Sequence, residues 1–139
     1  MLKKTITYTD YDGNVRNEDF YFNLTKAELM EMDLAEAGGL EEMLTRIISL
    51  RDTAKIISVF KDIILKSVGI KSPDGRKFIK NQEIRDDFSQ TEAFSDLYME
   101  LITNVDEAIA FVKGIVPADL AVEAEKQLAK QNISVVDSQ

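Results

Sequence analysis

The stretch "KKTITYTDYDGNVRNEDFYF", residues Lys3 to Phe22, decides the fold class of this chain. Its first seven residues alternate and are rich in Thr, Ile and Tyr, which is typical of a β-strand. The cluster "DYDGN" favours a turn, because Gly13 can adopt a positive φ. A second β-rich run, "VRNEDFYFNL", follows. The stretch therefore predicts a β-hairpin over residues 3–22, and one face of it must pack on other elements because a lone hairpin is only marginally stable.

The rest of the chain has the periodicity of helices, from residue 25 onward. Thr25 and Glu28 have capping-box spacing and open the first helix, which Gly38-Gly39 ends. The helix from Asp52 to about Val68 is the most apolar, and we expect it to be the central core helix. The other predicted helices cover about 40–50, a short stretch after the cap Asn81, about 90–102 after the capping box of Ser89 and Glu92, and Asn104 to about Gly114.

Residues 71–80 are interpreted as a connector in which "SPDG" forms a turn. The connector contains a local basic cluster in an otherwise acidic chain, and two readings of it stay open. It is either a solvated turn or a contact point for an acidic patch on a partner. The basic cluster consists of Lys71, Arg76, Lys77 and Lys80, and Phe78 lies within it.

These patterns predict an α+β fold that is mostly helical with a small N-terminal β-hairpin. At 139 residues the chain is most simply one domain. We expect a single globular domain over residues 1–117, followed by a C-terminal helix and a frayed tail over 118–139.

Composition disfavours several classes of function. The net charge is −8, from 25 acidic and 17 basic residues, and such a surface repels nucleic-acid phosphates. The chain has no cysteine and no histidine, so it lacks thiolate nucleophiles, the commonest general base and the commonest transition-metal ligands. No apolar run is long enough to span a membrane and the N-terminus lacks the core of a signal peptide, which predicts a cytoplasmic protein without membrane contact.

The remaining candidates for chemistry have simpler structural readings. The "DYDGN" acidic residues resemble a calcium loop, but Gly13 stands at the wrong position and the flanks are predicted strands. Three pairs of adjacent carboxylates are expected at helix N-termini or on polar faces, where they complement the helix dipole. They are Glu41 with Glu42, Asp86 with Asp87 and Asp106 with Glu107. We therefore predict no catalytic residue, no metal site and no cofactor.

Aromatic and methionine side chains have two possible roles. The aromatic residues are spaced as core anchors. Methionines in the predicted helices would either pack in the core or line an adaptable binding surface, since the thioether side chain is flexible. The candidate partner-binding residues are Met30, Met32, Met43, Arg76, Lys77 and Phe78; Met99 is a fourth helical methionine.

Three ordered phrases carry a resemblance to a known family: "DFYFNLTKAELMEMDLAEAGGLEEML", "FKDIILKSVGIKSPDGRKFIKNQEIRDDFSQTEAFSDLYMEL" and "AIAFVKGIVP". Together with the preceding hairpin, about residues 3–117, they resemble the tail assembly chaperones of long-tailed (siphovirus) phages and prophages of Gram-positive hosts. The resemblance rests on the order of residues, since none of the phrases is a chemical motif.

The resemblance implies a non-enzymatic helper protein in the host cytoplasm. Its partners would be the tape measure protein, which it keeps soluble, and the tail tube protein, whose subunits it helps to recruit. A homo-oligomer is also possible. Two alternatives stay open: a structural accessory subunit of the virion, such as a tail or capsid protein with strand edges that extend a sheet, and an enzyme that uses Asp, Glu, Lys or Tyr alone.

Overall fold

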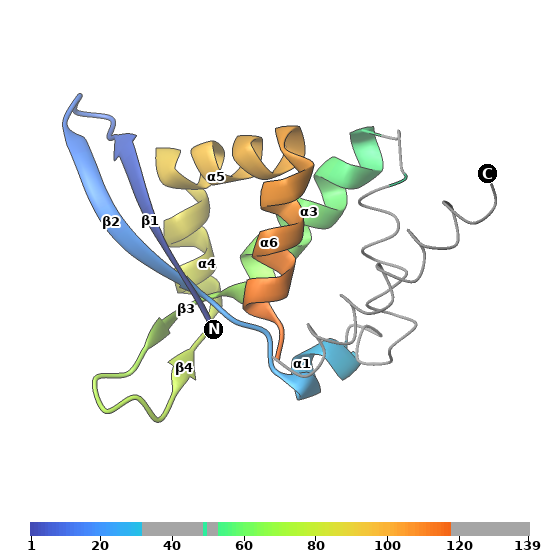
Figure 1. The fold of residues 1–139 in the computed structure, drawn as a ribbon. Helices are drawn as coiled ribbons and strands as arrows, with labels where there is room; N and C mark the ends of the chain where they lie inside the picture. Colours follow the sequence, from blue (N-terminus) through green and yellow to red (C-terminus); the bar gives the residue numbers. More distant parts are fainter. Residues whose placement is uncertain (32–48, 50–52, 118–139) are drawn as a thin grey trace, which may run out of the picture.

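The computed structural model describes residues 1–31, 49 and 53–117 of the chain. In these residues one antiparallel sheet with strand order β1-β2-β3-β4 packs against α-helices (Figure 1). The predicted α+β class is confirmed. The elements in chain order are β1 (Leu2–Thr9), β2 (Val15–Phe22), α1 (Lys26–Glu31), α3 (Thr53–Ser67), β3 (Val68–Lys71), β4 (Phe78–Ile79), α4 (Gln82–Ser89), α5 (Glu92–Thr103) and α6 (Val105–Ile115).

The N-terminal hairpin has the predicted strands and turn. β1 and β2 pair along their whole length, from Leu2 opposite Phe22 to Thr9 opposite Val15. Gly13 in the turn has φ +83°, a conformation that glycine adopts without a steric penalty. Every second side chain of β1 is buried or half-buried and the others are exposed. The hairpin therefore buries one face against the helices and leaves the other in solvent. This packing supplies the stability that an isolated hairpin lacks.

Aromatic rings join this inner face to the helices. The Phe88 ring of α4 lies with its centroid 4.9 Å from that of Phe20 and 5.7 Å from those of Phe22 and Phe94. The tilted and edge-on geometries are those that aromatic pairs favour. The predicted core anchors are thus confirmed as inward-facing: Phe22, Phe60, Phe88 and Phe111 are buried, and Phe20, Phe78, Phe94 and Tyr98 are partly buried.

Two successive residues after β2 tie the hairpin to distant parts of the chain. The backbone N–H of Asn23 donates to the carbonyl of Ser67 at 2.8 Å, and that of Leu24 donates to the carbonyl of Ile115 at 2.7 Å. Leu24 is buried. The exit of β2 is therefore fixed between the end of α3 and the end of α6, because both donors are satisfied there.

A second hairpin replaces the predicted connector over residues 71–80. The third predicted helix ends at Ser67, and Val68–Lys71 then continues as β3, which pairs with β2 and with β4. The predicted turn is present, since the N–H of Gly75 donates to the carbonyl of Ser72 at 2.9 Å and Gly75 has φ +76°. The connector reading was wrong because β3 and β4 have four and two residues, too few to show an alternating pattern.

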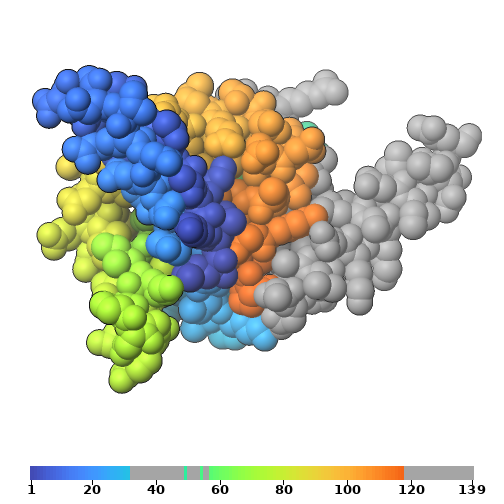
Figure 2. Space-filling view, turned by 60° about the vertical axis from the view of Figure 1, so that its left-hand side comes forward, coloured from blue at the N-terminus to red at the C-terminus, as the bar shows by residue number. Residues whose placement is uncertain are grey.

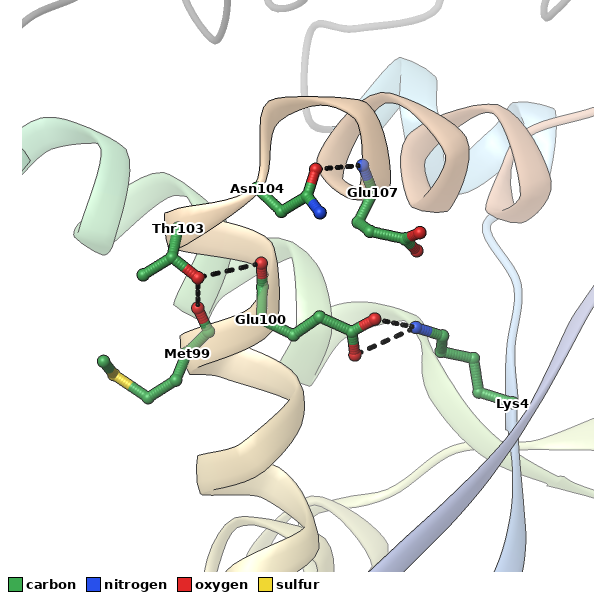
Figure 3. Close-up of polar contacts among 6 residues, drawn as sticks. All are labelled: Lys4, Met99, Glu100, Thr103, Asn104 and Glu107. Atoms are coloured by element: carbon green, nitrogen blue, oxygen red, sulfur yellow. Dashed lines mark hydrogen bonds and ion pairs between the residues drawn. The ribbon is translucent and has the colours of Figure 1, made fainter.

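Helix caps follow the predicted chemistry with one exception. Thr25 and Glu28 form the reciprocal capping box, at 3.0 and 3.1 Å. Asn81 and Asn104 accept from the backbone N–H groups three residues on, and Figure 3 shows the second of these caps beside the ion pair of Lys4 and Glu100. Ser89 is not a cap: it is the last residue of α4, and Thr91 caps α5. The prediction was wrong because Ser89 and Thr91 both carry a hydroxyl group that can cap a helix. Which of them caps α5 depends on where α4 ends, and α4 includes Ser89.

Several predictions fall outside the described residues. These are the end of the first helix at Gly38-Gly39, the helix over about 40–50 apart from Ser49, the cap at Asp52, the carboxylate pair Glu41 and Glu42, and the C-terminal helix and tail over 118–139.

Candidate functional site

An apolar groove opens between the two hairpins and α4. Its volume is about 470 Å³, within the range of roughly 300–1,000 Å³ that is usual for ligand pockets. Figure 2 shows the face on which the N-terminal hairpin, the second hairpin and α4 meet. The lining residues are Asp19, Phe20 and Tyr21 of β2, Val68, Gly69, Ile70 and Lys71 of β3, Ile84, Asp87 and Phe88 of α4, and Thr91.

The groove exists because β3 follows β2 for only two residue pairs. Tyr21 pairs with Gly69 and Phe22 with Val68, after which β3 pairs with β4 instead. The two hairpins diverge from this point (Figure 1). Gly69 permits the close approach of β4 to β3: a Cβ atom there would lie 2.6 Å from Cε2 of Phe78 and 2.8 Å from the carbonyl oxygen of Ile79, closer than real contacts. Any side chain at position 69 would therefore displace the second hairpin.

The divergence leaves one edge of β2 open. The carbonyl of Asn14 accepts from Asp10 on the β1 side, whereas the N–H of Asn23 donates toward Ser67 on the β3 side. Backbone groups of successive strand residues alternate between the two neighbouring strands. The N–H and C=O groups of Val15, Asn17 and Asp19 therefore face the β3 side, where no strand of the described residues pairs with them.

The floor of the groove is an aromatic surface. Phe20 and Phe88 meet there, and Phe88 is buried while Ile84 beside it is half-buried. Phe94 and Tyr98 extend the row of rings at 5.7 Å spacings, and the Tyr98 hydroxyl donates to the carbonyl of Ile57 at 3.2 Å. The row of rings therefore connects the floor of the groove to α5 and, through Tyr98, to α3.

Charged groups stand at the rim of the groove. Thr5 Oγ1 donates to Asp19 at 2.6 Å and, with Lys3 at 3.5 Å, holds the pKa of that carboxyl below its usual value. The Asp87 side chain is exposed on α4. Lys71 lies with Nζ 6.0 Å from the centre of the Tyr21 ring, within reach of a weak cation–π interaction. Because Thr5 and Lys3 of β1 already engage the Asp19 carboxylate, Asp87 is the exposed carboxylate at the groove.

The predicted partner-binding residues lie at three different places. Arg76 and Lys77 are exposed in the turn of the second hairpin, and within the described residues neither side chain forms an ion pair. Phe78 is partly buried and packs over Gly69. Met30 on α1 is 70% exposed. Met32 and Met43 lie outside the described residues.

Only two of the four residues in the predicted basic cluster point outward. Lys80 Nζ lies 2.6 Å from the carbonyl oxygen of Asn23 and 2.5 Å from Oε2 of Glu28, and only 12% of the Lys80 side chain is exposed. Including Lys80 in a partner-facing cluster was therefore wrong, since its charge is used inside the fold. Lys71 points back over β2, which leaves Arg76 and Lys77 as the outward pair.

The groove was missed by the sequence analysis. Its lining residues come from two strands, a helix and a loop, and the only local signal was the apolar run "VGI" directly after the most apolar helix. Among the described residues no group of carboxylates converges as a metal site, and none of the described helices has the length and apolarity to cross a membrane. The turn "DYDGN" is a hairpin turn, with Asp10 accepting from the N–H groups of Asp12 and Asn14.

The groove offers open backbone groups, apolar surface and a charged rim, which are the features of a small α+β domain that works by contact with other polypeptides. The phage tail assembly chaperone family matches the chain over residues 1–139. The chain belongs to this family, a class of non-enzymatic proteins, and the prediction of a non-enzyme is confirmed. Neither the curated proteins nor the solved structures gave a match.

Proposed function

We propose that this chaperone binds the tape measure protein of its phage and helps to recruit tail tube subunits around it, in the host cytoplasm, and that its phage is a siphovirus of a Gram-positive host. The observation that carries the proposal is the family match over the whole chain, together with the sequence phrases that resemble siphovirus chaperones. Family membership implies tail protein partners, and we propose that these are the tape measure and tail tube proteins.

The charge and surface of the chain support this role. A net charge of −8 keeps a complex with an apolar client soluble through repulsion between complexes. The described surface also carries apolar side chains that a client could cover, with Met30 70% exposed and Ile70 55% exposed. Removal of such surface from water drives association. We propose Met30, Met32, Met43, Arg76, Lys77 and Phe78 as contributors to client binding.

The test of the proposal is co-expression of the chain with the tape measure protein of the same phage. We expect a larger soluble fraction of the tape measure protein and its co-purification with the chaperone. An unchanged soluble fraction without co-purification would refute the proposal. A second experiment repeats the assay with the tail tube protein added, and recruitment predicts a ternary complex.

Charge reversal tests the outward basic pair. Arg76→Glu and Lys77→Glu should each weaken client binding without changing the melting temperature, because both side chains are exposed in a turn. Lys61→Glu on α3 is a matched control, since Lys61 is also exposed and the charge change is identical. Equal binding by all three variants would make the second hairpin a structural element only.

A structural subunit of the virion is the second candidate function, and the open strand edges favour it. β1 and part of β2 have no partner strand on one side within the described residues, and such edges can extend a sheet between subunits. Mass spectrometry of purified particles separates the two functions. A chaperone that leaves before assembly ends is absent from mature particles, whereas a subunit is abundant there.

A further inference from the structure

We infer that the open edge of β2 receives an extended segment of a client tail protein, which adds to the sheet as a strand and places a side chain in the groove over Phe20 and Phe88. This inference rests on the proposed function, because the occupant is taken to be a client of the chaperone. It assigns the binding surface and the mode of recognition, and it predicts the sequence pattern of the bound segment.

The backbone of β2 has room for such a strand. Eight residues form β2 and two of them pair with β3, so six residues, from Val15 to Phe20, have no partner strand on that side within residues 1–31 and 53–117. Six strand residues extend over about 20 Å. The outward N–H and C=O groups of Val15, Asn17 and Asp19 offer six hydrogen-bonding groups to a neighbour. An extended peptide can form hydrogen bonds with these N–H and C=O groups, which is the basis of recognition by strand addition.

The alternation of the strand predicts the side chains of the occupant. Phe20 faces inward to Phe88, so the client residue opposite Phe20 also points inward, over the apolar floor of the groove. Asp19 faces the solvent side, where Thr5 and Lys3 of β1 already engage its carboxylate. Asp87 stands at the same groove with its side chain exposed. We therefore predict a client segment with apolar residues at alternate positions and a Lys or Arg that reaches Asp87.

Charge argues against a second copy of this chain as the occupant. Each copy carries a net charge of −8, and two such surfaces repel each other. The other open edge, that of β1, is a poorer site, because none of the residues that line the groove belongs to β1. A second cleft of about 550 Å³ near α1, α3 and α4 lies away from either edge and is lined mainly by charged residues, including Asp62, Lys66 and Arg85.

Two substitutions test the site. Asn17→Pro removes an N–H that faces the open side and leaves the backbone hydrogen bonds between β1 and β2 intact, because proline is tolerated where a strand N–H faces solvent. It also removes the exposed hydrogen bond from the Thr7 hydroxyl to the Asn17 side chain, so Asn17→Ala is its control. Asp87→Lys reverses a rim charge without changing the backbone. Asp96→Lys on α5 is the matched control, since Asp96 is also exposed and does not line the groove. Circular dichroism melting of each variant confirms that it is folded.

The probes are the co-expressed tape measure and tail tube proteins and an array of their overlapping peptides, each of about 12 residues so that it covers the open edge. We expect Asn17→Pro and Asp87→Lys each to weaken binding by about tenfold or more, and Asp96→Lys to bind like the wild type. Amide hydrogen exchange in the wild-type protein gives a second readout. The N–H groups of residues 15, 17 and 19 should exchange fast in the free chain and slowly in the complex.

The outcomes separate this inference from the proposed function. If the wild type binds a client and neither variant loses affinity, or if the amides of residues 15, 17 and 19 stay fast in the complex, strand addition is refuted and the chaperone function stands. If Asn17→Pro fails to fold, Asp87→Lys and the exchange data decide. If the wild type binds neither tail protein, the proposed function fails and the inference fails with it. Slow exchange of these amides only on self-association would assign the edge to a second copy and overturn the inference.

Discussion

Replacing Lys80 by methionine should lower the free energy of unfolding by about 2 kcal/mol. Lys80 Nζ lies 2.6 Å from the Asn23 carbonyl oxygen and 2.5 Å from a Glu28 oxygen, and 12% of its side chain is exposed. A hydrogen bond to a charged group contributes roughly 1.5–3 kcal/mol, which sets the scale. Methionine keeps the aliphatic stem, so the loss reports the ammonium group and not a cavity.

Solvent access to Glu28 limits how much unfolding free energy the Lys80→Met variant loses. Removal of one partner from a fully buried ion pair costs about 3–5 kcal/mol. About one third of the Glu28 side chain is exposed, at 32%, so its carboxylate can be hydrated again in the variant. We therefore expect a loss below that range. In a double-mutant cycle with Glu28→Gln, the coupling energy should be about 1 kcal/mol, because the Asn23 carbonyl and the Phe78 ring, whose centre lies 5.7 Å from Nζ, account for the rest.

The pH dependence of the same variant gives an independent check. Burial alone would raise the pKa of Glu28, but Lys80 and the N–H of Thr25 outweigh it and lower the pKa below its ordinary value of 4.5. A group with a lowered folded-state pKa stabilises the fold above its unfolded-state pKa, and this contribution is lost as the pH falls through the folded-state value. The difference in stability between wild type and Lys80→Met should therefore shrink below about pH 4.5.

Urea unfolding of the full chain at several pH values measures both effects. A loss smaller than about 0.5 kcal/mol at pH 7 would refute the reasoning, since that is the range of exposed ion pairs. A difference that stays constant from pH 7 to below the Glu28 pKa would show that Lys80 acts through Asn23 and Phe78 and not through Glu28.

Three further substitutions probe the features that shape the groove. Gly69→Ala should lower the free energy of unfolding by about 1–3 kcal/mol through overpacking against Phe78, and Phe78→Ala in the same chain should recover part of the loss in thermal melting; no loss in the single variant would contradict the close approach. Phe88→Ala should cost about 3–5 kcal/mol in urea unfolding, because a buried ring that touches three others leaves a cavity, and a cost below 1 kcal/mol would argue against its central place. Asn104→Ala should cost about 1 kcal/mol by loss of the α6 cap, whereas Asn104→Asp, which keeps the acceptor for the Glu107 N–H, should be close to neutral.

The sequence predicted the parts of the fold that depend on local chemistry. Gly13 marked the turn of the first hairpin, and the spacing of Thr25 and Glu28, like that of Asn104 and Glu107, marked helix starts. These signals need only three or four consecutive residues and are independent of tertiary contacts. The strand Val68–Lys71 was not predicted because its partner β2 is about fifty residues away, and Phe78–Ile79 was not predicted because two residues show no pattern.

The candidate site was predicted less well than the fold. Arg76 and Lys77 are exposed as expected of a contact point, but Phe78 packs inward and Lys80 is used as an internal partner of Glu28. Composition identified the basic residues and could not distinguish which of them find an acidic partner within the chain. The groove itself depends on where β3 stops pairing with β2, after Gly69, and no local pattern of residues marks this point.

The two hydrogen bonds that follow β2 have a consequence for folding during synthesis. The partner of Leu24 is the carbonyl of Ile115, so the first hairpin leaves the ribosome long before the residues that complete its packing. A nascent chain that ends before α6 leaves Phe22 without the Phe111 ring that lies 5.2 Å from it in the finished fold. Such late, distant contacts slow folding and leave apolar surface transiently open. A truncated chain should therefore itself be prone to aggregation. This chaperone can complete its fold only when almost all of its described domain has been translated.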